Sequence, residues 1–421
     1  MPLLTLVIEK PAAGGRMLAR HEGQVVLVSG AIPGERVSVR LERTGRGVAF
    51  GEVTEVLRAS ADRRAAAIDS RCGGNVFSHI VYSRQLTLKG EIIEDAFRRI
   101  GRLPLSETPL VTESPERGYR MRARLHVHGG RIGFYLEGSH HICDAAGTGQ
   151  LQPETSAWIA AAQQALDKKR LDGLTAFEIA ENIPGDQRAC HLELHGGAEP
   201  SAYDALAEGL VGLSAQRADR AGVERIAGVP VVTDSIGVAG GSPFVLSLGR
   251  DVRAFFQGNR FLVEALVRRV LDLVPVGPVI DLYAGVGLFG LSLAAAGCEP
   301  VAVVEGDPVS GADLARNANP FGDRVAVVRH RVETYLASAR PRDVSHSTVI
   351  VDPPRTGLSK QALAPIVGLQ PRRIVYVSCD VATLARDVRA LLDAGYGLAH
   401  LSGLDLFPNT AHVETVAVLN R

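Results

Sequence analysis

The sequence lacks three features that would each assign it to a class of protein. No stretch offers about 18 apolar residues free of charge, so it contains no candidate membrane span. Its 46 Lys and Arg residues balance 46 Asp and Glu residues, and this zero net charge favours neither an acidic nor a basic partner. Its five cysteines are odd in number and scattered without framework spacing, which favours a reducing compartment.

The N-terminus also lacks the features of a secretory signal. The opening "MPLLTLVIEKPAAGGR" has only a short apolar run, and Glu9 follows it early, whereas a signal peptide needs a longer apolar region. We therefore expect a cytoplasmic protein that does not associate with membranes.

The length and the distribution of charge are more informative than the totals. A chain of 421 residues suggests two to four domains at about 100–200 residues per domain. Residues 1–135 contain 21 basic and 14 acidic residues and therefore carry +7, which the remainder of the chain offsets. This asymmetry is typical of a part that faces a polyanion, and a solvated charged surface explains it equally well.

Three regions with different patterns follow one another along the chain. Residues 1–58 contain short β-branched or alternating stretches separated by turns, which predicts a small OB-like β-barrel. Such barrels often hold nucleic acid, although a generic adaptor barrel has the same pattern. Residues 59–250 mix helical spacing with strands, which predicts an α+β domain. From 251 to 421, strands alternate with helices, as in a doubly wound, Rossmann-like α/β sheet with a possible antiparallel strand near the end.

The central region contains one row of basic residues that stands out. The stretch "YRMRARLHVHGGRIGFYLEGS" predicts a β-hairpin around Gly129 and Gly130. Arg120, Arg122 and Arg124 then fall on one strand face at a period of two, where they suit the phosphates of a nucleic acid. Solvated charges on an exposed strand are the alternative.

The C-terminal region places chemically distinctive residues at the ends of predicted strands. "VIDLYAGVGLFG" has the glycine spacing of a nucleotide-binding turn, which suits a dinucleotide or S-adenosylmethionine. Asp281 before the glycines and Glu305 at the end of the next strand favour S-adenosylmethionine. Asp352, Cys379 and Glu414 occupy three further strand ends. Each alone could be structural, but together they suggest a cofactor ligand, a nucleophile and a general base around one cleft.

These motifs resemble the RNA (uracil-5-)-methyltransferase family. The resemblance rests on "FFQGN" (255–259), "DLYAGVGLFGL" (281–291), "VDPPRTGL" (351–358), "VSCDVATLARD" (377–387) and "AHVETVAVL" (411–419), in the order and spacing of the family. The N-terminal barrel is similar to the TRAM domain of many members, and the central hairpin resembles their central domain.

The resemblance implies a set of site residues and partners. S-adenosylmethionine would contact Gln257, Tyr283, Glu305 and Asp352. Cys379 would attack C6 of a uracil, and Glu414 would remove the proton at C5. The partner would be a structured RNA, either ribosomal or transfer RNA, with its target base flipped out of the stack. The chain would act as a monomer, and no metal site is expected.

The sequence departs from the family at two places. Many relatives hold an iron–sulfur cluster with four cysteines, but only Cys72 and Cys143 match those positions here, while Ala66 and Asn75 stand at the others. Two thiolates cannot supply four ligands, so we expect no cluster. Beside the nucleophile, Asp380 and Val381 replace the usual Asn and Pro, and the charge of Asp380 is expected to raise the pKa of the Cys379 thiol.

Two other functions share parts of this pattern. An amino-group nucleic-acid methyltransferase has the glycine-rich turn and the Asp-Pro-Pro sequence but needs no thiol. An RNA-binding factor with a decayed methyltransferase site would bind RNA without transferring a methyl group, although the presence of Cys379 and Glu414 argues against decay. A dinucleotide oxidoreductase is remote, because nothing supplies a partner for a hydride.

Overall fold

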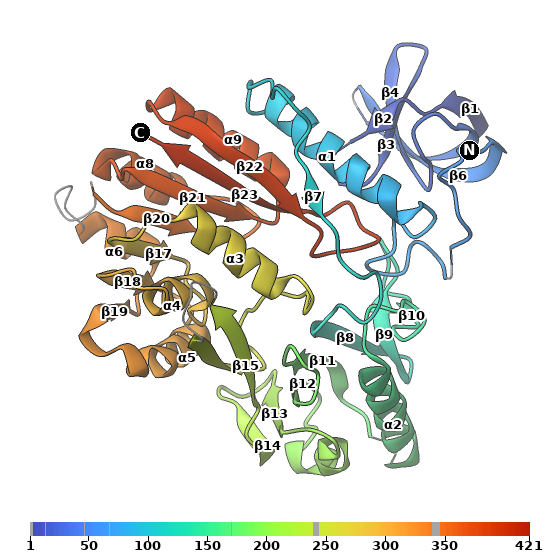
Figure 1. Ribbon diagram of the computed structural model, residues 1–421. Helices are drawn as coiled ribbons and strands as arrows, with labels where there is room; N and C mark the ends of the chain where they lie inside the picture. Colours follow the sequence, from blue (N-terminus) through green and yellow to red (C-terminus); the bar gives the residue numbers. More distant parts are fainter. Residues whose placement is uncertain are drawn as a thin grey trace.

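The computed structural model combines three β-sheet regions in the arrangement that the sequence predicts (Figure 1). It describes residues 3–12, 14–45, 47–66, 68–169, 171–238, 244–338 and 346–421. A small N-terminal sheet and a central α+β region lie beside a large C-terminal α/β sheet, so the predicted fold class is confirmed. None of the described helices combines the length and the apolar character needed to cross a bilayer.

The N-terminal region is a six-stranded sheet in the order β1-β5-β6-β4-β3-β2. Alternate side chains of its strands, such as Val37 and Val39, point inward and are fully buried, as the period of two requires. The strands are β1 (Leu3–Val7), β2 (Lys10–Pro11), β3 (Met17–His21), β4 (Gln24–Ser29), β5 (Arg36–Thr44) and β6 (Val48–Arg58).

Helix α1 (Tyr82–Arg99) joins this sheet to the C-terminal region. Leu88 belongs to the core of the N-terminal sheet, whereas Ile93 and Phe97 belong to the core beneath the large sheet. One helix therefore buries two apolar faces, and Figure 1 shows it between the two regions. Lys89, also fully buried, pairs with the carboxylate of Asp405 near the end of the chain.

The central region has a seven-stranded sheet in the order β10-β9-β8-β11-β12-β13-β14. The predicted hairpin is confirmed: β8 and β9 pair antiparallel, with His128 opposite Arg131. Helix α2 and the 3-10 helix η1 cover one face through side chains such as Trp158 and Tyr203. The elements are β8 (Arg122–His128), β9 (Arg131–Tyr135), β10 (Ile142–Cys143), α2 (Pro153–Lys169), β11 (Leu174–Glu181), β12 (Arg188–Leu194), η1 (Pro200–Ala207), β13 (Gly212–Arg217) and β14 (Glu224–Gly228).

A two-stranded ribbon, β15 (Val231–Val238) and β16 (Phe244–Asp251), leads into the C-terminal region. The side chain of Arg250 is fully buried and donates to Asp234 across the ribbon at 2.7 Å. Asn317 on α5 (Pro308–Ala318) also accepts from the backbone N–H of Gly249. These contacts fix the ribbon against the C-terminal sheet.

The C-terminal sheet has eight strands in the order β19-β18-β17-β20-β21-β23-β22-β7. The first five are parallel, and β23 is antiparallel to β21, as the sequence suggested. The strands are β7 (Val111–Thr112), β17 (Val279–Leu282), β18 (Val301–Val304), β19 (Val325–Val328), β20 (Thr348–Val351), β21 (Arg373–Ser378), β22 (Gly397–Leu404) and β23 (Glu414–Asn420).

Helices cover both faces of this sheet, which makes it doubly wound. Helices α3, α4 and α5 contribute to the core on one face, and α1, α6, α8 and α9 contribute to the core on the other. Their bounds are α3 (Val263–Leu273), α4 (Leu288–Ala295), α5 (Pro308–Ala318), α6 (Val332–Ser338), α8 (Lys360–Leu369) and α9 (Val381–Asp393), and a 3-10 helix η2 spans Asn319–Arg324.

Candidate functional site

A cavity of about 730 Å³ lies at the carboxyl ends of the parallel strands. In open α/β sheets this edge is where ligands bind, because the strand ends and the following loops converge there. All six residues that the sequence predicts for the site line this cavity: Gln257, Tyr283, Glu305, Asp352, Cys379 and Glu414.

The register of the sheet explains why these residues meet. Leu282 pairs with Val304 on one side and Val351 on the other, so Tyr283, Glu305 and Asp352 follow three adjacent strand ends. Strand β23 runs the opposite way and therefore begins where the parallel strands end. Ser378 pairs with Thr415 at the end of this ladder, so Cys379 directly follows the last pair and Glu414 directly precedes it, and both line the cavity.

The glycine-rich turn shapes one wall of the cavity. Gly287 caps α4 at a φ of 102°, in the left-handed region that favours glycine. A Cβ at Gly290 would lie 2.5 Å from the Val303 side chain, so this position requires glycine for packing. Asp281 accepts from the Gly290 N–H at 2.7 Å and is fully buried. Asp281 does not line the cavity and holds the turn, whereas Glu305 lines the cavity.

Glu305 lies at the mouth of this turn. Its two carboxylate oxygens accept backbone N–H groups, Oε2 from Gly285 at 2.8 Å and Oε1 from Asp307 at 2.6 Å. These bonds fix the carboxylate in one orientation, while burial raises its pKa above the usual value. Tyr283 next to it adopts a φ of 64°, which turns its backbone away from the strand direction.

Asp352 and Gln257 form a polar pair on the opposite wall. Gln257, at 5 % exposure, donates from Nε2 to Oδ2 of Asp352 at 3.3 Å. Burial raises the pKa of Asp352 to about 7, well above that of an exposed carboxyl. Two prolines follow Asp352 and fix the backbone that presents it.

The Cys379 thiol is partly exposed to the cavity at the end of β21. Burial, together with the nearby charges of Glu414 and Asp352, raises the pKa of Cys379 to about 11. The guanidinium of Arg355 opposes this shift through its charge and a hydrogen bond to the thiol. Sequence reasoning did not single out Arg355, although its place directly after Asp-Pro-Pro was a usable signal.

The pKa of Cys379 is raised, as predicted, and its main causes are groups other than Asp380. Asp380 caps α9, where its side chain accepts from the Thr383 N–H at 2.9 Å. The largest causes of the raised thiol pKa are burial, then the charges of Glu414 and Asp352. Asp380 therefore acts as an N-cap, a role that Asn also fills, and its negative charge is stabilised at a helix N-terminus.

Glu414 is the most enclosed ionisable group of the cavity, at 2 % exposure. Burial raises its pKa well above the usual value, and the charge of Asp352 raises it further, while Arg355 acts in the opposite direction. A carboxylate whose pKa is raised is a stronger base, as proton removal requires.

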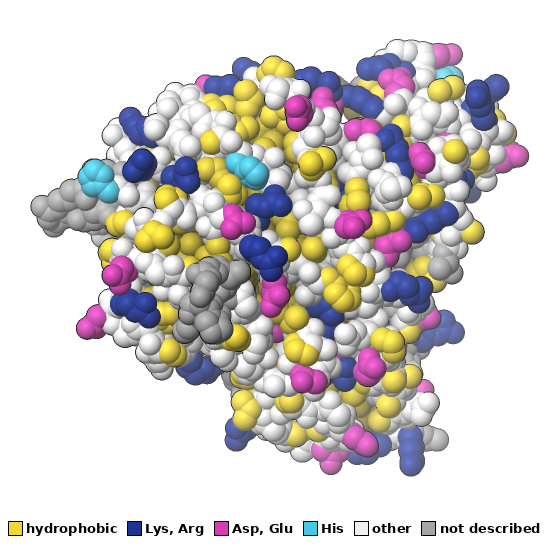
Figure 2. Space-filling model, viewed as in Figure 1, with side chains coloured by type: hydrophobic (Ala, Val, Ile, Leu, Met, Phe, Trp, Pro, Cys, Tyr) yellow, Lys and Arg dark blue, Asp and Glu magenta, His cyan; other side chains and the backbone are white. Residues whose placement is uncertain are grey.

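The arginine row reaches the same cavity. Arg120, Arg122 and Arg124 all line it, but each has a partner within the chain. Arg122 pairs with Glu178 at 2.8 Å and Arg124 with Glu193 at 2.6 Å, and Arg120 donates to Gln150 at 2.7 Å. Figure 2 accordingly shows basic and acidic side chains interspersed over the visible face, without one continuous basic area.

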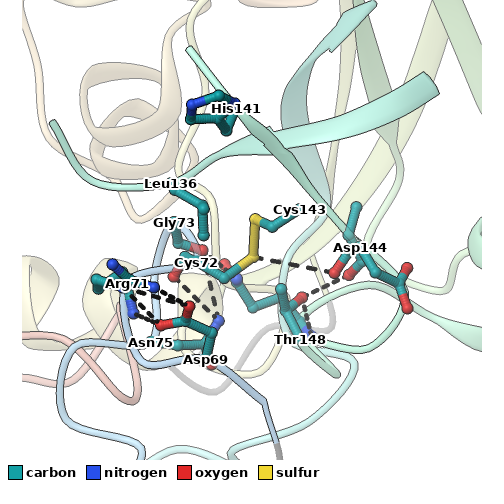
Figure 3. The surroundings of a disulfide bond; sticks show 12 residues. Asp69, Arg71, Cys72, Gly73, Asn75, Leu136, His141, Cys143, Asp144 and Thr148 are labelled. Atoms are coloured by element: carbon teal, nitrogen blue, oxygen red, sulfur yellow. Dashed lines mark hydrogen bonds and ion pairs between the residues drawn. A yellow bond between two sulfur atoms is a disulfide. The ribbon is translucent and has the colours of Figure 1, made fainter. Parts of the chain in front are cut away.

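Cys72 and Cys143 form a disulfide, although they lie 71 positions apart in the sequence (Figure 3). Their sulfurs are bonded to each other and so do not act as free thiolate ligands. Among the described residues, no group of three or more His, Cys, Asp or Glu side chains could hold a metal ion.

Comparisons with known proteins identify two family models and several full-length relatives. The tRNA (uracil-5-)-methyltransferase family model matches residues 250–421, and the TRAM domain model matches residues 4–54. An uncharacterized RNA methyltransferase of Thermosynechococcus vestitus is 32 % identical over 99 % of this chain and 97 % of its own. A 23S rRNA (uracil(1939)-C(5))-methyltransferase RlmD of Azoarcus sp. is 30 % identical over 99 % of each chain.

A solved structure shows the same fold. The tRNA (uracil-54, C5)-methyltransferase of Pyrococcus abyssi, in complex with S-adenosyl-L-homocysteine, superposes with a TM-score of 0.79. That match covers 98 % of this chain and 99 % of the other, at 23 % identity. With full-length relatives at 30 % identity or more, this chain belongs to the RNA (uracil-5-)-methyltransferase family of S-adenosylmethionine-dependent enzymes.

Proposed function

We propose that this chain methylates C5 of a uridine in ribosomal or transfer RNA through a covalent bond between Cys379 and C6 of the base. The observation that carries the proposal is the cavity that both Cys379 and Glu414 line, beside the last pair of the β21–β23 ladder. An amino-group methyltransferase needs neither a thiol nor a base in this position. The names of the RlmD relatives and of the Pyrococcus enzyme, which specify C5 of uracil, support the same reaction.

The residues of the cavity fit S-adenosylmethionine. Glu305 offers a fixed carboxylate beside the glycine-rich turn, which suits a ribose diol, and the turn itself lets backbone approach a ligand closely. Gln257, Tyr283 and Asp352 complete the proposed contacts. When bound, S-adenosylmethionine supplies a methyl group carried on a sulfonium sulfur.

Cys379 provides the activation that uracil needs. C5 of uracil is a poor nucleophile, but addition of the thiolate to C6 breaks the C5–C6 double bond and moves its electron pair toward C5 and O4. The carbon at C5 then has carbanion character and accepts a methyl group. Only the thiolate adds, so Arg355, which opposes the rise in the pKa of Cys379, favours this step.

Glu414 completes the cycle. After C5 carries the methyl group, the carboxylate removes the remaining C5 proton, the C5–C6 double bond re-forms, and the bond between C6 and Sγ breaks. The raised pKa of Glu414 makes its carboxylate a stronger base, and its charge acts on the Cys379 thiol in the same cavity, which supports a shared role of the two groups at one base.

The substrate and the setting follow from this chemistry. A uracil inside a helix cannot present C6 to a thiol, so the target base leaves its stack before reaction. The TRAM domain and the arginine row would hold the flanking RNA. We also propose that the chain works as a monomer in the cytoplasm, and light scattering after size-exclusion chromatography tests the first of these statements.

Transfer of labelled methyl groups from S-adenosylmethionine to 23S rRNA and tRNA transcripts tests the proposal. The Cys379→Ala variant should lose transfer, and Glu414→Gln should accumulate a covalent RNA adduct that survives denaturing electrophoresis. An amino-group methyltransferase would retain turnover in Cys379→Ala. An RNA-binding factor with a decayed site would bind the transcripts without incorporating label. Mapping of 5-methyluridine in RNA from cells that lack the protein then identifies the target, and an unchanged map would refute the proposal.

A further inference from the structure

The strand face that lines the cavity continues beyond it. On β8, Arg122 and Arg124 line the cavity, and His126 is the next residue on the same face. At a rise of about 3.4 Å per residue, the distance from Arg122 to His126 along the strand is about 14 Å. The face therefore continues from the cavity along β8, past Arg124 to His126.

Tyr135 on the neighbouring strand joins this face. His126 pairs with Gly133, so the antiparallel register places Tyr135 opposite Arg124. The rings of Tyr135 and His126 are stacked, with centroids 3.8 Å apart and planes inclined by 11°. The ring of His140 meets Tyr135 edge-on at 5.3 Å. Both stacked rings remain partly exposed.

This aromatic pair does not serve the hydrophobic core. Phe134 and Leu136, the neighbours of Tyr135 in the sequence, pack on the core of the central region, whereas Tyr135 and His126 lie on the opposite face. Burial lowers the pKa of His126, and the charges of Arg124 and His140 lower it further. The imidazole is therefore neutral near pH 7, and a neutral ring suits stacking with a nucleobase.

Strand β9, which carries Tyr135, is held in place from both sides, by β8 and by β10. Ile142 and Cys143 of β10 pair with Tyr135 and Phe134. Cys143 is bonded to Cys72, and Cys72 itself forms a bridge with Leu136 (Figure 3). The disulfide therefore fastens the strand on which Tyr135 lies, and a preorganised ring loses little freedom when a ligand stacks on it.

We propose that Tyr135 and His126 form a stacking platform for an unpaired base of the substrate RNA beside the target uridine, with Arg124 at the adjacent phosphate. Single-stranded nucleic acid is recognised by this combination of stacking rings and guanidinium groups. In the free protein Arg124 pairs with Glu193 at an exposed position, and such surface pairs are weak enough to exchange for a phosphate. The inference rests on the proposed function for its substrate.

Steady-state kinetics with the transcript that the wild-type chain methylates test the platform. Removal of one stacked base contact in Tyr135→Ala should raise the KM for RNA about tenfold, with kcat and the KM for S-adenosylmethionine unchanged. Tyr135→Phe keeps the ring and serves as the matched control, with a KM near that of the wild type. Tyr135→Leu keeps apolar bulk without an aromatic face and should resemble Tyr135→Ala. Thermal melting of each variant identifies any that fail to fold.

The salt dependence of RNA binding separates the phosphate contact of Arg124 from the stacking contact of Tyr135. Arg124→Ala should reduce the slope of log Kd against log salt concentration by about 1, whereas Tyr135→Ala should leave the slope unchanged. A KM for RNA that is unchanged in Tyr135→Ala, or raised equally in Tyr135→Phe, would overturn the platform.

A binding measurement keeps this inference separate from the proposed function. Fluorescence anisotropy with a labelled single-stranded oligoadenylate needs no methyl transfer, and Tyr135→Ala should weaken its binding about tenfold. If the wild-type chain methylates no RNA, the proposed function fails while this measurement still decides the platform. If methylation is normal and oligoadenylate binds Tyr135→Ala as tightly as the wild type, only the platform fails.

Discussion

Gln257 donates a hydrogen bond to Asp352 across 95 positions of sequence, at 3.3 Å. The contact joins the segment before α3 to the end of β20, so two separate motifs form one wall of the cavity. Asp352 is also costly to ionise in this cavity without a compensating positive charge, because burial raises its pKa. The stability of the folded chain should therefore depend on the protonation of Asp352.

Asp352→Asn should alter how the free energy of unfolding depends on pH. The folded-state pKa of about 7 exceeds the usual carboxyl value, so the folded chain binds more protons than the unfolded chain between about pH 4 and 7. Stability from this group is therefore present at low pH and is lost as pH rises through 7. For each unit by which the folded-state pKa of Asp352 exceeds its unfolded-state pKa, full ionisation lowers the free energy of unfolding by about 1.4 kcal/mol. Relative to the wild type, Asp352→Asn should gain stability between pH 5 and 8.

Urea denaturation of both proteins at pH 5, 6, 7 and 8 measures this difference. The same measurement on Glu414→Gln separates the pH dependence due to Asp352 from that due to Glu414, because the charge of Asp352 contributes to the raised pKa of Glu414. If the curves of the wild type and Asp352→Asn run parallel over this range, Asp352 is ionised in the folded chain at all these values.

Arg355→Ala should make the Cys379 thiol less reactive. The pKa of the thiol is about 11 in the wild type, and loss of the guanidinium raises it further. Alkylation by iodoacetamide reports the thiolate, so its rate at pH 8 should fall several-fold, and the midpoint of the pH–rate curve should move upward. Arg389→Ala is the matched control, because Arg389 pairs with Asp393 on α9 and does not line the cavity.

Peptide mapping assigns the alkylation to Cys379, since Cys190 and Cys298 are buried. Equal alkylation rates in Arg355→Ala and the wild type would mean that Arg355 does not act on the thiol.

Replacement of Cys72 and Cys143 by Ser should destabilise the chain without changing the cavity. A native disulfide that closes a long loop contributes about 2–4 kcal/mol, chiefly by restricting the unfolded chain. Reduction of the wild type should produce a similar loss, whereas a reductant should not affect the double variant. Thiol titration in denaturant should find three free thiols before reduction and five after it. Five free thiols in the untreated protein would contradict the disulfide.

The sequence predicted that the side chains of the site meet in one cavity, because parallel strands bring their carboxyl ends together. Once Asp352 and Cys379 were assigned to strand ends, their meeting followed from topology. Strand β22 and the pairing of the short β7 with it were not predicted, because long-range pairing determines them. The pairing of Cys72 with Cys143 was also missed, since cysteine spacing alone does not fix connectivity.

Electrostatic detail was harder to predict than geometry. Sequence adjacency suggested that Asp380 acts on the thiol, but the helix N-terminus directs that carboxylate to Thr383. The groups that do shift the pKa of Cys379 are Glu414, Asp352 and Arg355, which are near in space only. The division of the chain at residues 58 and 250 stays a prediction.

Lys89→Met should be among the most damaging single changes outside the cavity. Lys89 on α1 is fully buried and pairs with Asp405, and its ammonium also donates to the Phe407 carbonyl at 3.0 Å. Tyr82 donates to the same carboxylate at 3.0 Å, so α1 fixes the segment that leads to Glu414. Removal of the ammonium leaves a buried carboxylate without its counter-charge, at a cost of about 3–5 kcal/mol.

The same helix offers a matched control for this experiment. Lys10 pairs with Asp95 of α1 at a more exposed position, and such a surface pair contributes at most about 1 kcal/mol. Lys10→Met should therefore shift the urea midpoint far less than Lys89→Met. The double variant Lys89→Met with Asp405→Asn should recover part of the loss, because the neutral amide removes the unpaired charge. Equal effects of Lys10→Met and Lys89→Met would mean that water reaches the Lys89 site and that α1 is not anchored by a buried ion pair.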